Sequence, residues 1–251
     1  MSETHQAVQI AVRTDIGQKR TENQDYISSY TNEVGLPLLV LADGMGGHRA
    51  GNIASQMAAT LLGEKWRQSS LTDLSAIRRW LQQEIETVNR LVHEKGLEEQ
   101  YRGMGTTIEA VVVAGHVALY GHVGDSRIGL YHEGSYQQVT NDHSLVNELV
   151  QAGQLTEEEA QHHPQKNIIT QSIGQPSPVV VDVGVETLVA GDILVVNSDG
   201  LTNMISKEQL EEVLSQADSL DDKTKALIGL ANQAGGLDNI SVGLILAESE
   251  G

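Results

Sequence analysis

The chain has 251 residues, 39% of them hydrophobic and 20% charged, which is the composition of a folded globular protein and excludes wholesale disorder. It contains no cysteine, which excludes disulfides, thiolate metal sites and cysteine nucleophiles. Against 34 Asp and Glu there are only 16 Lys and Arg, and so acidic a surface, with a formal charge of −18, repels nucleic acid and anionic membranes.

The first half of the chain predicts strands followed by two helices. Alternation of apolar and polar residues predicts a strand over 8–12, and a short apolar run predicts a buried strand over 38–42. Good helix formers without proline predict a helix from Gly51 to about Gln68. Apolar residues three and four positions apart predict a long amphipathic helix over 73–95 that ends at Gly96.

The second half mixes hairpins with helices. One hairpin is expected over 106–123 around Gly115-His116, and another over 127–139 around Glu133-Gly134. Short helices are expected over 144–151 and from a capping box at Thr156. Further strands are predicted over 179–189, 193–197 and 240–247, with helices starting at Ser206 and near residue 221. This mixture indicates the α+β class, and with no linker in the sequence we expect one domain over 1–251.

Aspartates recur where the predicted strands end or begin. Asp43, Asp125 and Asp199 follow apolar runs and Asp238 precedes one, each beside Gly, Ser or Asn. An uncompensated buried carboxylate is costly, so such tips call for a cation. Oxygen ligands without cysteine favour a hard ion such as Mg²⁺, Mn²⁺ or Ca²⁺. The alternative for any single motif is that Asp-Gly only makes a turn.

The order of these motifs resembles the metal-dependent protein phosphatases of type 2C, above all the compact bacterial members that oppose Ser/Thr kinases in Gram-positive cells. The similarity runs from about residue 8 to residue 247, so that residues 1–6 are expected to be a short extra tail. The matching segments are Thr14–Asp25, Ala42–His48, Gly103–Thr107, Gly124–Arg127, Ser198–Leu201 and Asp238–Val242.

The resemblance implies a four-layer α-β-β-α sandwich, in which two antiparallel sheets are flanked by helix pairs, with a binuclear Mn²⁺/Mg²⁺ centre at one end. By motif position, Asp43 would bridge both ions and Gly44 would bind one through its carbonyl. Asp199 and Asp238 would bind the other ion.

The resemblance also implies roles around the ions. Asp25 would hold metal-bound water, Asp125 would serve a weaker third ion, and Arg20 would grip the substrate phosphate with its planar donor pair. His48 is either a general acid for the leaving oxygen or a surface or helix-start residue. Arg127 is expected to pair with a carboxylate, and His162-His163 to be solvated.

The implied function is hydrolysis of phosphoserine and phosphothreonine in proteins by a metal-activated water. The partners would be phosphorylated proteins, among them a cognate Ser/Thr kinase. Two alternatives remain: a metal-dependent phosphoesterase for small phosphates, and a non-catalytic module that binds phosphoproteins. Residues 143–174, with weak strand patterning, are expected to form a flap at the site. No signal peptide or membrane span is evident, so we expect a cytoplasmic protein, and a monomer.

Overall fold

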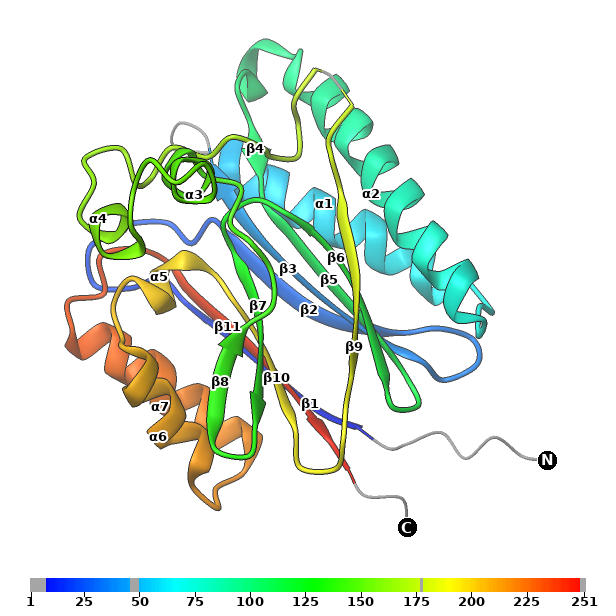
Figure 1. Ribbon diagram of the computed structural model, residues 1–251. Helices are drawn as coiled ribbons and strands as arrows, with labels where there is room; N and C mark the ends of the chain where they lie inside the picture. The colour runs from blue at the N-terminus through cyan, green and yellow to red at the C-terminus, as the bar shows by residue number, and fades with distance from the viewer. Residues whose placement is uncertain (1–7, 46–49, 177, 249–251) are drawn as a thin grey trace.

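Two antiparallel sheets lie face to face in the computed structural model, which describes residues 8–45, 50–176 and 178–248 (Figure 1). One sheet has five strands in the order β1-β11-β10-β7-β8. Its strands are β1 (Val8–Asp15), β7 (Arg127–His132), β8 (Ser135–Gln138), β10 (Ile193–Asn197) and β11 (Ile240–Ala247).

The other sheet runs in the order β2-β3-β5-β6-β9, with the short β4 paired to the end of β3. Its strands are β2 (Asp25–Thr31), β3 (Pro37–Met45), β4 (Gly105–Thr106), β5 (Ile108–Ala114), β6 (Val117–Val123) and β9 (Asp182–Thr187). All the pairings in both sheets are antiparallel.

Two helix pairs cover the outer faces of the sheets. The helices α1 (Ala50–Arg67) and α2 (Leu74–Gly96) lie on the six-stranded sheet, while α6 (Lys207–Ser215) and α7 (Leu220–Gln233) lie on the five-stranded sheet (Figure 1). Side-chain caps set their starts: Asp73 accepts a hydrogen bond from the Ala76 amide at 2.8 Å, and Ser206 forms a capping box with Gln209. The expected four-layer α-β-β-α sandwich is confirmed.

A continuous apolar layer separates the two sheets. Leu39, Leu41 and Val111 face it from one sheet, and Val196 and Ile245 face it from the other, all fully or almost fully buried. Burial of such side chains is worth ~1.5–3 kcal/mol each, so this layer holds the strand ends in fixed relative positions. The site described below lies where this layer meets solvent.

Most predicted elements are present, with two informative differences. The sequence pattern did not predict β2, an edge strand whose residues alternate weakly; its Tyr30 ring packs directly onto Gly63 of α1, which leaves no room there for a Cβ atom. The strand expected over 179–189 is only Asp182–Thr187 long, because β6 offers it partners only from Val117 to His122. None of the helices within the described residues combines the length and apolar character that spanning a bilayer requires.

The segment 143–174 crosses one end of the sandwich and contains two short helices, α3 (Leu145–Gln151) and α4 (Glu157–Gln161) (Figure 1). Both of its ends are hydrogen-bonded to strand tips. The His143 amide donates to the Gly124 carbonyl at 2.7 Å, and Ile173 forms an isolated bridge with Thr106. The segment is therefore anchored at both roots beside the predicted site.

Candidate metal centre

The fold gathers the predicted aspartates at one end of the sheet sandwich. Asp25 begins β2 directly opposite Asp43 of β3, and Asp125 follows β6. Asp199 is the first residue of α5 (Asp199–Thr202), immediately after β10, and Asp238 lies two residues before β11. Burial raises the pKa of Asp43 most, and charge repulsion from each of the other four carboxylates raises it further, so the five groups form one cluster.

Asp25 is the most deeply buried member, with 7% of its surface exposed. The Ser198 hydroxyl donates to its Oδ2 at 2.8 Å, but its Oδ1 is buried without a hydrogen-bond partner among the described residues. Burial raises the pKa of Asp25 to about 6, although hydrogen bonds from Ser241 and Ser198 oppose the shift. A buried carboxylate oxygen without a partner, on a residue that lies opposite Asp43, fits a site built for water and cations.

The backbone of Asp43 is held by two threonines. Its amide donates to the Thr107 hydroxyl at 2.9 Å, and its carbonyl accepts from the Thr106 hydroxyl at 2.8 Å and from the Thr107 amide at 2.9 Å. Because the Thr107 oxygen accepts from Asp43, its own proton is free to reach the Ser126 hydroxyl, 2.9 Å away. This chain of bonds links Asp43 to the turn that carries Asp125.

Gly44 lies where no side chain fits. A Cβ atom there would come within 2.1 Å of the Gly51 carbonyl oxygen and 2.6 Å of the Gln24 carbonyl oxygen. The Gly44 amide donates to that Gln24 carbonyl at 3.0 Å. Glycine is therefore required for β3 to pass this close to the start of α1.

Asp125 and Asp199 also have pKa values above the ordinary value of a carboxyl group. Burial raises the pKa of Asp199 to about 6 and that of Asp125 to about 7, and repulsion by Asp238 and Asp199, respectively, adds to each shift. Burial also raises the pKa of Asp43 well above its usual range. Clustered carboxylates that resist ionisation are stabilised by a bound cation, so the donor set fits a hard divalent metal ion.

The fit has a condition. Within the described residues, no three His, Cys, Asp or Glu side chains converge closely enough to enclose an ion by themselves. A metal ion in this cluster would therefore need carbonyl and water oxygens to complete its coordination. Mg²⁺, which keeps several waters when bound to proteins, has this requirement, and Mn²⁺ takes the same oxygen ligands.

Arg20 lies at the rim of the cluster and reaches one of its members. Its Nη2 donates to Asp238 Oδ2 at 2.7 Å, and 53% of its side chain is exposed. The loop that carries it is tied down by Asn239, which donates to the Ile16 and Glu22 carbonyls and accepts from the Gln24 amide. Arg20 is thus held over the site, where part of its charge compensates Asp238.

Arg127 pairs with a carboxylate, as expected, and the partner is Asp142. Three hydrogen bonds of 2.6–3.2 Å join the guanidinium to both oxygens of Asp142. Among the described residues no hydrogen bond or ion pair joins Arg127 to Asp125, and burial and neighbouring carboxylates outweigh the opposing effect of the Arg127 charge on the pKa of Asp125, so a simple ion pair does not account for Asp125. His48 lies in the segment 46–49, outside the described residues.

The sequence did not predict a role for several residues that build the site. These are the hydroxyls and amides behind the carboxylates: Thr106, Thr107, Ser126, Ser198, Asn239 and Ser241. Three of them, Ser126, Ser198 and Asn239, are direct sequence neighbours of a predicted aspartate, and all six lie in segments that match the family; these two signals could have marked them. Their role becomes visible only once strands distant in sequence are brought together.

Comparisons with known proteins identify the family to which the chain belongs. The family model described as "Protein phosphatase 2C" matches residues 16–232. Protein phosphatase PhpP of Streptococcus pneumoniae is 52% identical over 97% of this chain and 99% of its own. The solved serine/threonine phosphatase of S. agalactiae has a TM-score of 0.94 and 58% identity, covering 96% of this chain and 100% of its own.

A further solved structure, the catalytic domain of the serine/threonine protein phosphatase PstP, contains two manganese ions. It has a TM-score of 0.84 and 31% identity, and the match covers 96% of this chain and 99% of that one. The family match covers most of the chain, and the relatives match over almost their whole lengths. This chain therefore belongs to the protein phosphatase 2C family of metal-dependent serine/threonine protein phosphatases.

Proposed function

We propose that the carboxylate cluster holds a pair of Mn²⁺ or Mg²⁺ ions, with Asp43 between them, the Gly44 carbonyl on one, and Asp199 and Asp238 on the other. Asp125 serves a third, weaker position. The observation that carries this proposal is the cluster of carboxylates with raised pKa values around the unpartnered Asp25 Oδ1. The two manganese ions of PstP support the same count.

Bound divalent ions supply a nucleophile at neutral pH and neutralise charge on the phosphoryl oxygens. The chain's own residues do the rest. Asp25 orients water through Oδ1, with Ser198 holding its other oxygen. Arg20, exposed at the rim, binds the phosphate with its planar donor pair, for which a carboxylate-sized partner such as Asp238 is a stand-in.

The substrate is a phosphoserine or phosphothreonine in a protein, hydrolysed in one step without a phosphoenzyme. The partially open cluster, with Asp43, Asp125, Asp199 and Asp238 all part-exposed, is accessible to a protruding side chain. His48 stays a candidate general acid for the leaving oxygen. The further expectations of a cognate Ser/Thr kinase among the substrates, a monomeric state, a cytoplasmic location and a single domain are parts of the same proposal.

The test measures phosphate release from a phosphothreonine peptide at rising Mn²⁺, beside nucleotides as small-phosphate substrates and a chelator control. We expect Mn²⁺-dependent release that favours the peptide. Asp199→Ala and Asp238→Ala should each lower turnover by orders of magnitude. The control Asp221→Ala removes an exposed carboxylate of α7 that pairs with Arg13, and it should leave turnover unchanged. Near-native turnover in either site variant would refute the ligand assignment, and preference for nucleotides would favour the small-phosphate alternative.

A further inference from the structure

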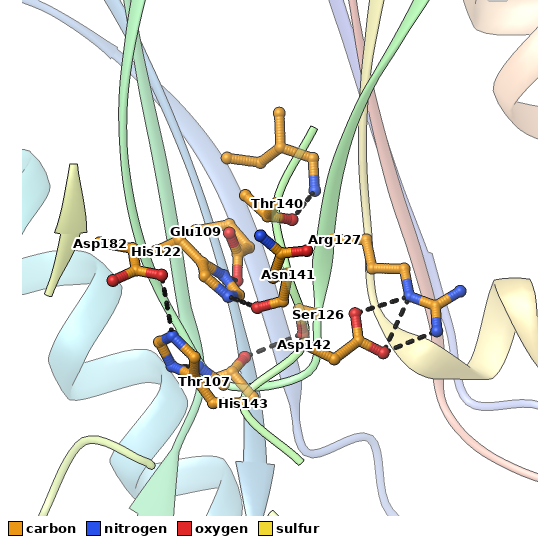
Figure 2. Close-up of polar contacts among 12 residues, drawn as sticks. Thr107, Glu109, His122, Ser126, Arg127, Thr140, Asn141, Asp142, His143 and Asp182 are labelled. Carbon is orange, nitrogen blue, oxygen red and sulfur yellow. Dashed lines mark hydrogen bonds and ion pairs between the residues drawn. The ribbon is translucent and has the colours of Figure 1, made fainter. Parts of the chain in front are cut away.

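A buried ion pair lies directly behind the Asp125 turn. Glu109 of β5 and His122 of β6 are cross-strand partners, both fully buried, and His122 Nδ1 is 2.7 Å from Glu109 Oε1 (Figure 2). They continue the rows of Val111 and Tyr120, so they occupy positions in the apolar layer between the sheets. An ionisable pair in such a layer costs desolvation energy that apolar residues would not incur.

The partners of His122 define its protonation. Its Nε2 is 2.9 Å from the Asn141 carbonyl oxygen, which can only accept, so Nε2 carries a proton. Burial by itself would lower the pKa of His122, but the Glu109 carboxylate and its hydrogen bond raise it to about 9. Whichever of the two groups holds the proton between them, the ring bonds both Glu109 and the Asn141 carbonyl and so ties β5 and β6 to the segment after β8.

His143 completes the contact from the other side. Its ring lies against that of His122 at a tilt of 45°, with centroids 4.5 Å apart, and its Nδ1 accepts from the Gly124 amide at 3.2 Å. Its Nε2 then donates to Asp182 at 3.2 Å, so this second ring is neutral, and burial indeed lowers the pKa of His143. The His143 amide returns a bond to the Gly124 carbonyl at 2.7 Å.

These contacts bracket Asp125. On one side Gly124, with φ of +126°, is bonded twice to His143. On the other side Ser126 is bonded to Thr107. Asp142, between Asn141 and His143, reaches across to Arg127 of the opposite sheet (Figure 2). The turn that carries Asp125 is thus fastened to the root of the 143–174 segment, and the fastening rests on His122.

We propose that Glu109 and His122 are positioning residues for catalysis: together they fix the backbone of the Gly124–Asp125 turn against Asn141–His143 and so place the Asp125 carboxylate. This inference rests on the role of Asp125 in the proposed function. Positioning, and not stability, explains why a charged pair is kept in the apolar layer, where residues of similar size would pack at no loss of stability.

The test uses a double variant, Glu109→Leu with His122→Phe, which removes both charges but keeps side-chain volume and a ring against His143. We expect it to fold with a melting temperature at or above the native one. The Gly124 amide should exchange hydrogen faster than in the native metal-free protein. The weaker Mn²⁺ site, measured by equilibrium dialysis, should lose affinity about tenfold, and turnover of a small aryl phosphate should fall.

Two further variants sharpen the result. Glu109→Gln should behave as native, because its amide donates to Nδ1 while Nε2 still donates to Asn141. The control is His132→Phe. His132 lies at the end of β7 away from the carboxylate cluster, and its substitution removes a His–carboxylate contact of the same length, 2.7 Å to Asp192. This variant should leave Mn²⁺ binding and Gly124 exchange unchanged. A folded double variant with native Gly124 exchange, Mn²⁺ binding and turnover would overturn the proposal, as would equal damage from Glu109→Gln.

Asp125→Ala separates this proposal from the one on which it rests. Native Mn²⁺ binding and turnover in Asp125→Ala would overturn the assignment of Asp125 itself. Loss in Asp125→Ala combined with native behaviour of the double variant would overturn only the positioning role of Glu109 and His122.

Discussion

The Arg20 side chain can bind two partners of similar chemistry, a carboxylate and a phosphate. In the structure its guanidinium bonds the Asp238 carboxylate at 2.7 Å, and in the proposed reaction it binds a phosphate. Both partners present paired oxygens to a planar fork of N–H donors. A cation beside Asp238 would weaken the first contact by competing for the carboxylate, which frees the exposed Arg20 side chain for a substrate.

Arg20→Ala should therefore raise KM for a phosphopeptide more than it lowers kcat, because the hydrolytic chemistry stays with the metal ligands. Arg20→Lys should restore part of the affinity, since a point charge lacks the two-pronged geometry. Steady-state kinetics at saturating Mn²⁺ provide the measurement, with Lys19→Ala, an exposed neighbouring cation, as the control. An unchanged KM in Arg20→Ala would exclude the phosphate role.

Single residues also show how far the sequence could lead. Asp43, Asp199 and Asp238 were predicted because aspartate next to Gly or Asn at a strand end is visible in the sequence. Glu109 and His122 were not predicted, although Glu109 interrupts the apolar run 108–113. The hairpin predicted over 106–123 already pairs Glu109 with His122, but the contact of His122 with the Asn141 carbonyl depends on the three-dimensional fold.

At the scale of elements, period and caps carried most of the prediction. The amphipathic spacing predicted α2, which runs from Leu74 to Gly96, and the capping boxes at Thr156 and Ser206 predicted α4 and α6. The edge strand β2 escaped prediction because tertiary contacts, such as Tyr30 on Gly63, and not alternation hold it in place. The length of β9 could not be predicted from the local pattern either, because the residues of β6 that pair with it set that length.

The 143–174 segment is expected to select among protein substrates, since both its roots lie beside the cluster. The first turn of α4 carries Glu157 and Glu158, both exposed, and we expect their charges to repel acidic phosphopeptides. Replacing both by Gln should lower KM for an acidic phosphoprotein severalfold and leave turnover of a small aryl phosphate unchanged, because the catalytic carboxylates are untouched. Kinetics on both substrates at low salt make the comparison.

The matched control for that change is Glu208→Gln with Glu212→Gln on α6, which covers the outer face of the five-stranded sheet. This pair alters net charge equally but lies away from the segment. The same KM change in both double variants would assign the effect to overall charge, and equal changes on both substrates would make the segment part of the chemistry.

At the scale of the whole molecule, the negative net charge and the carboxylate cluster both oppose folding when no metal is bound. A chain with formal charge −18 gathers five carboxylates at one end of its sandwich, with one cationic side chain, Arg20, bonded directly to the cluster through Asp238 among the described contacts. Folding without metal therefore has to bring these charges together. Burial also raises the pKa of Glu109 to about 7, although the neighbouring His122 opposes this shift, so Glu109 too resists ionisation in the folded chain.

The sign of the resulting pH dependence follows from linkage. Burial raises the pKa values of Asp25, Asp125 and Asp199 to about 6, 7 and 6 from an ordinary value of 3.8. Between about pH 4 and pH 7 the folded chain therefore binds more protons than the unfolded chain, and the free energy of unfolding falls as the pH rises. The contribution of these carboxyl groups to the free energy of unfolding should be fully present below about pH 4 and lost as the pH rises through 6 to 7. Salt-bridged carboxylates behave in the opposite way.

We accordingly expect the chelated protein to melt at a higher temperature at pH 5.5 than at pH 7.5, by at least ~4 °C, since ~1 kcal/mol moves the midpoint by ~2–4 °C in a chain of this size. Mn²⁺ should reverse the order, because it binds the ionised cluster of the folded state and raises stability most at pH 7.5. Asp199→Asn should flatten the pH dependence of the chelated protein, whereas Asp221→Asn, on the exposed surface of α7, should not.

Calorimetry at both pH values, with and without Mn²⁺, tests this prediction. Equal or higher stability of the chelated native protein at pH 7.5 would mean that the carboxylates are compensated within the protein and have no need of a cation.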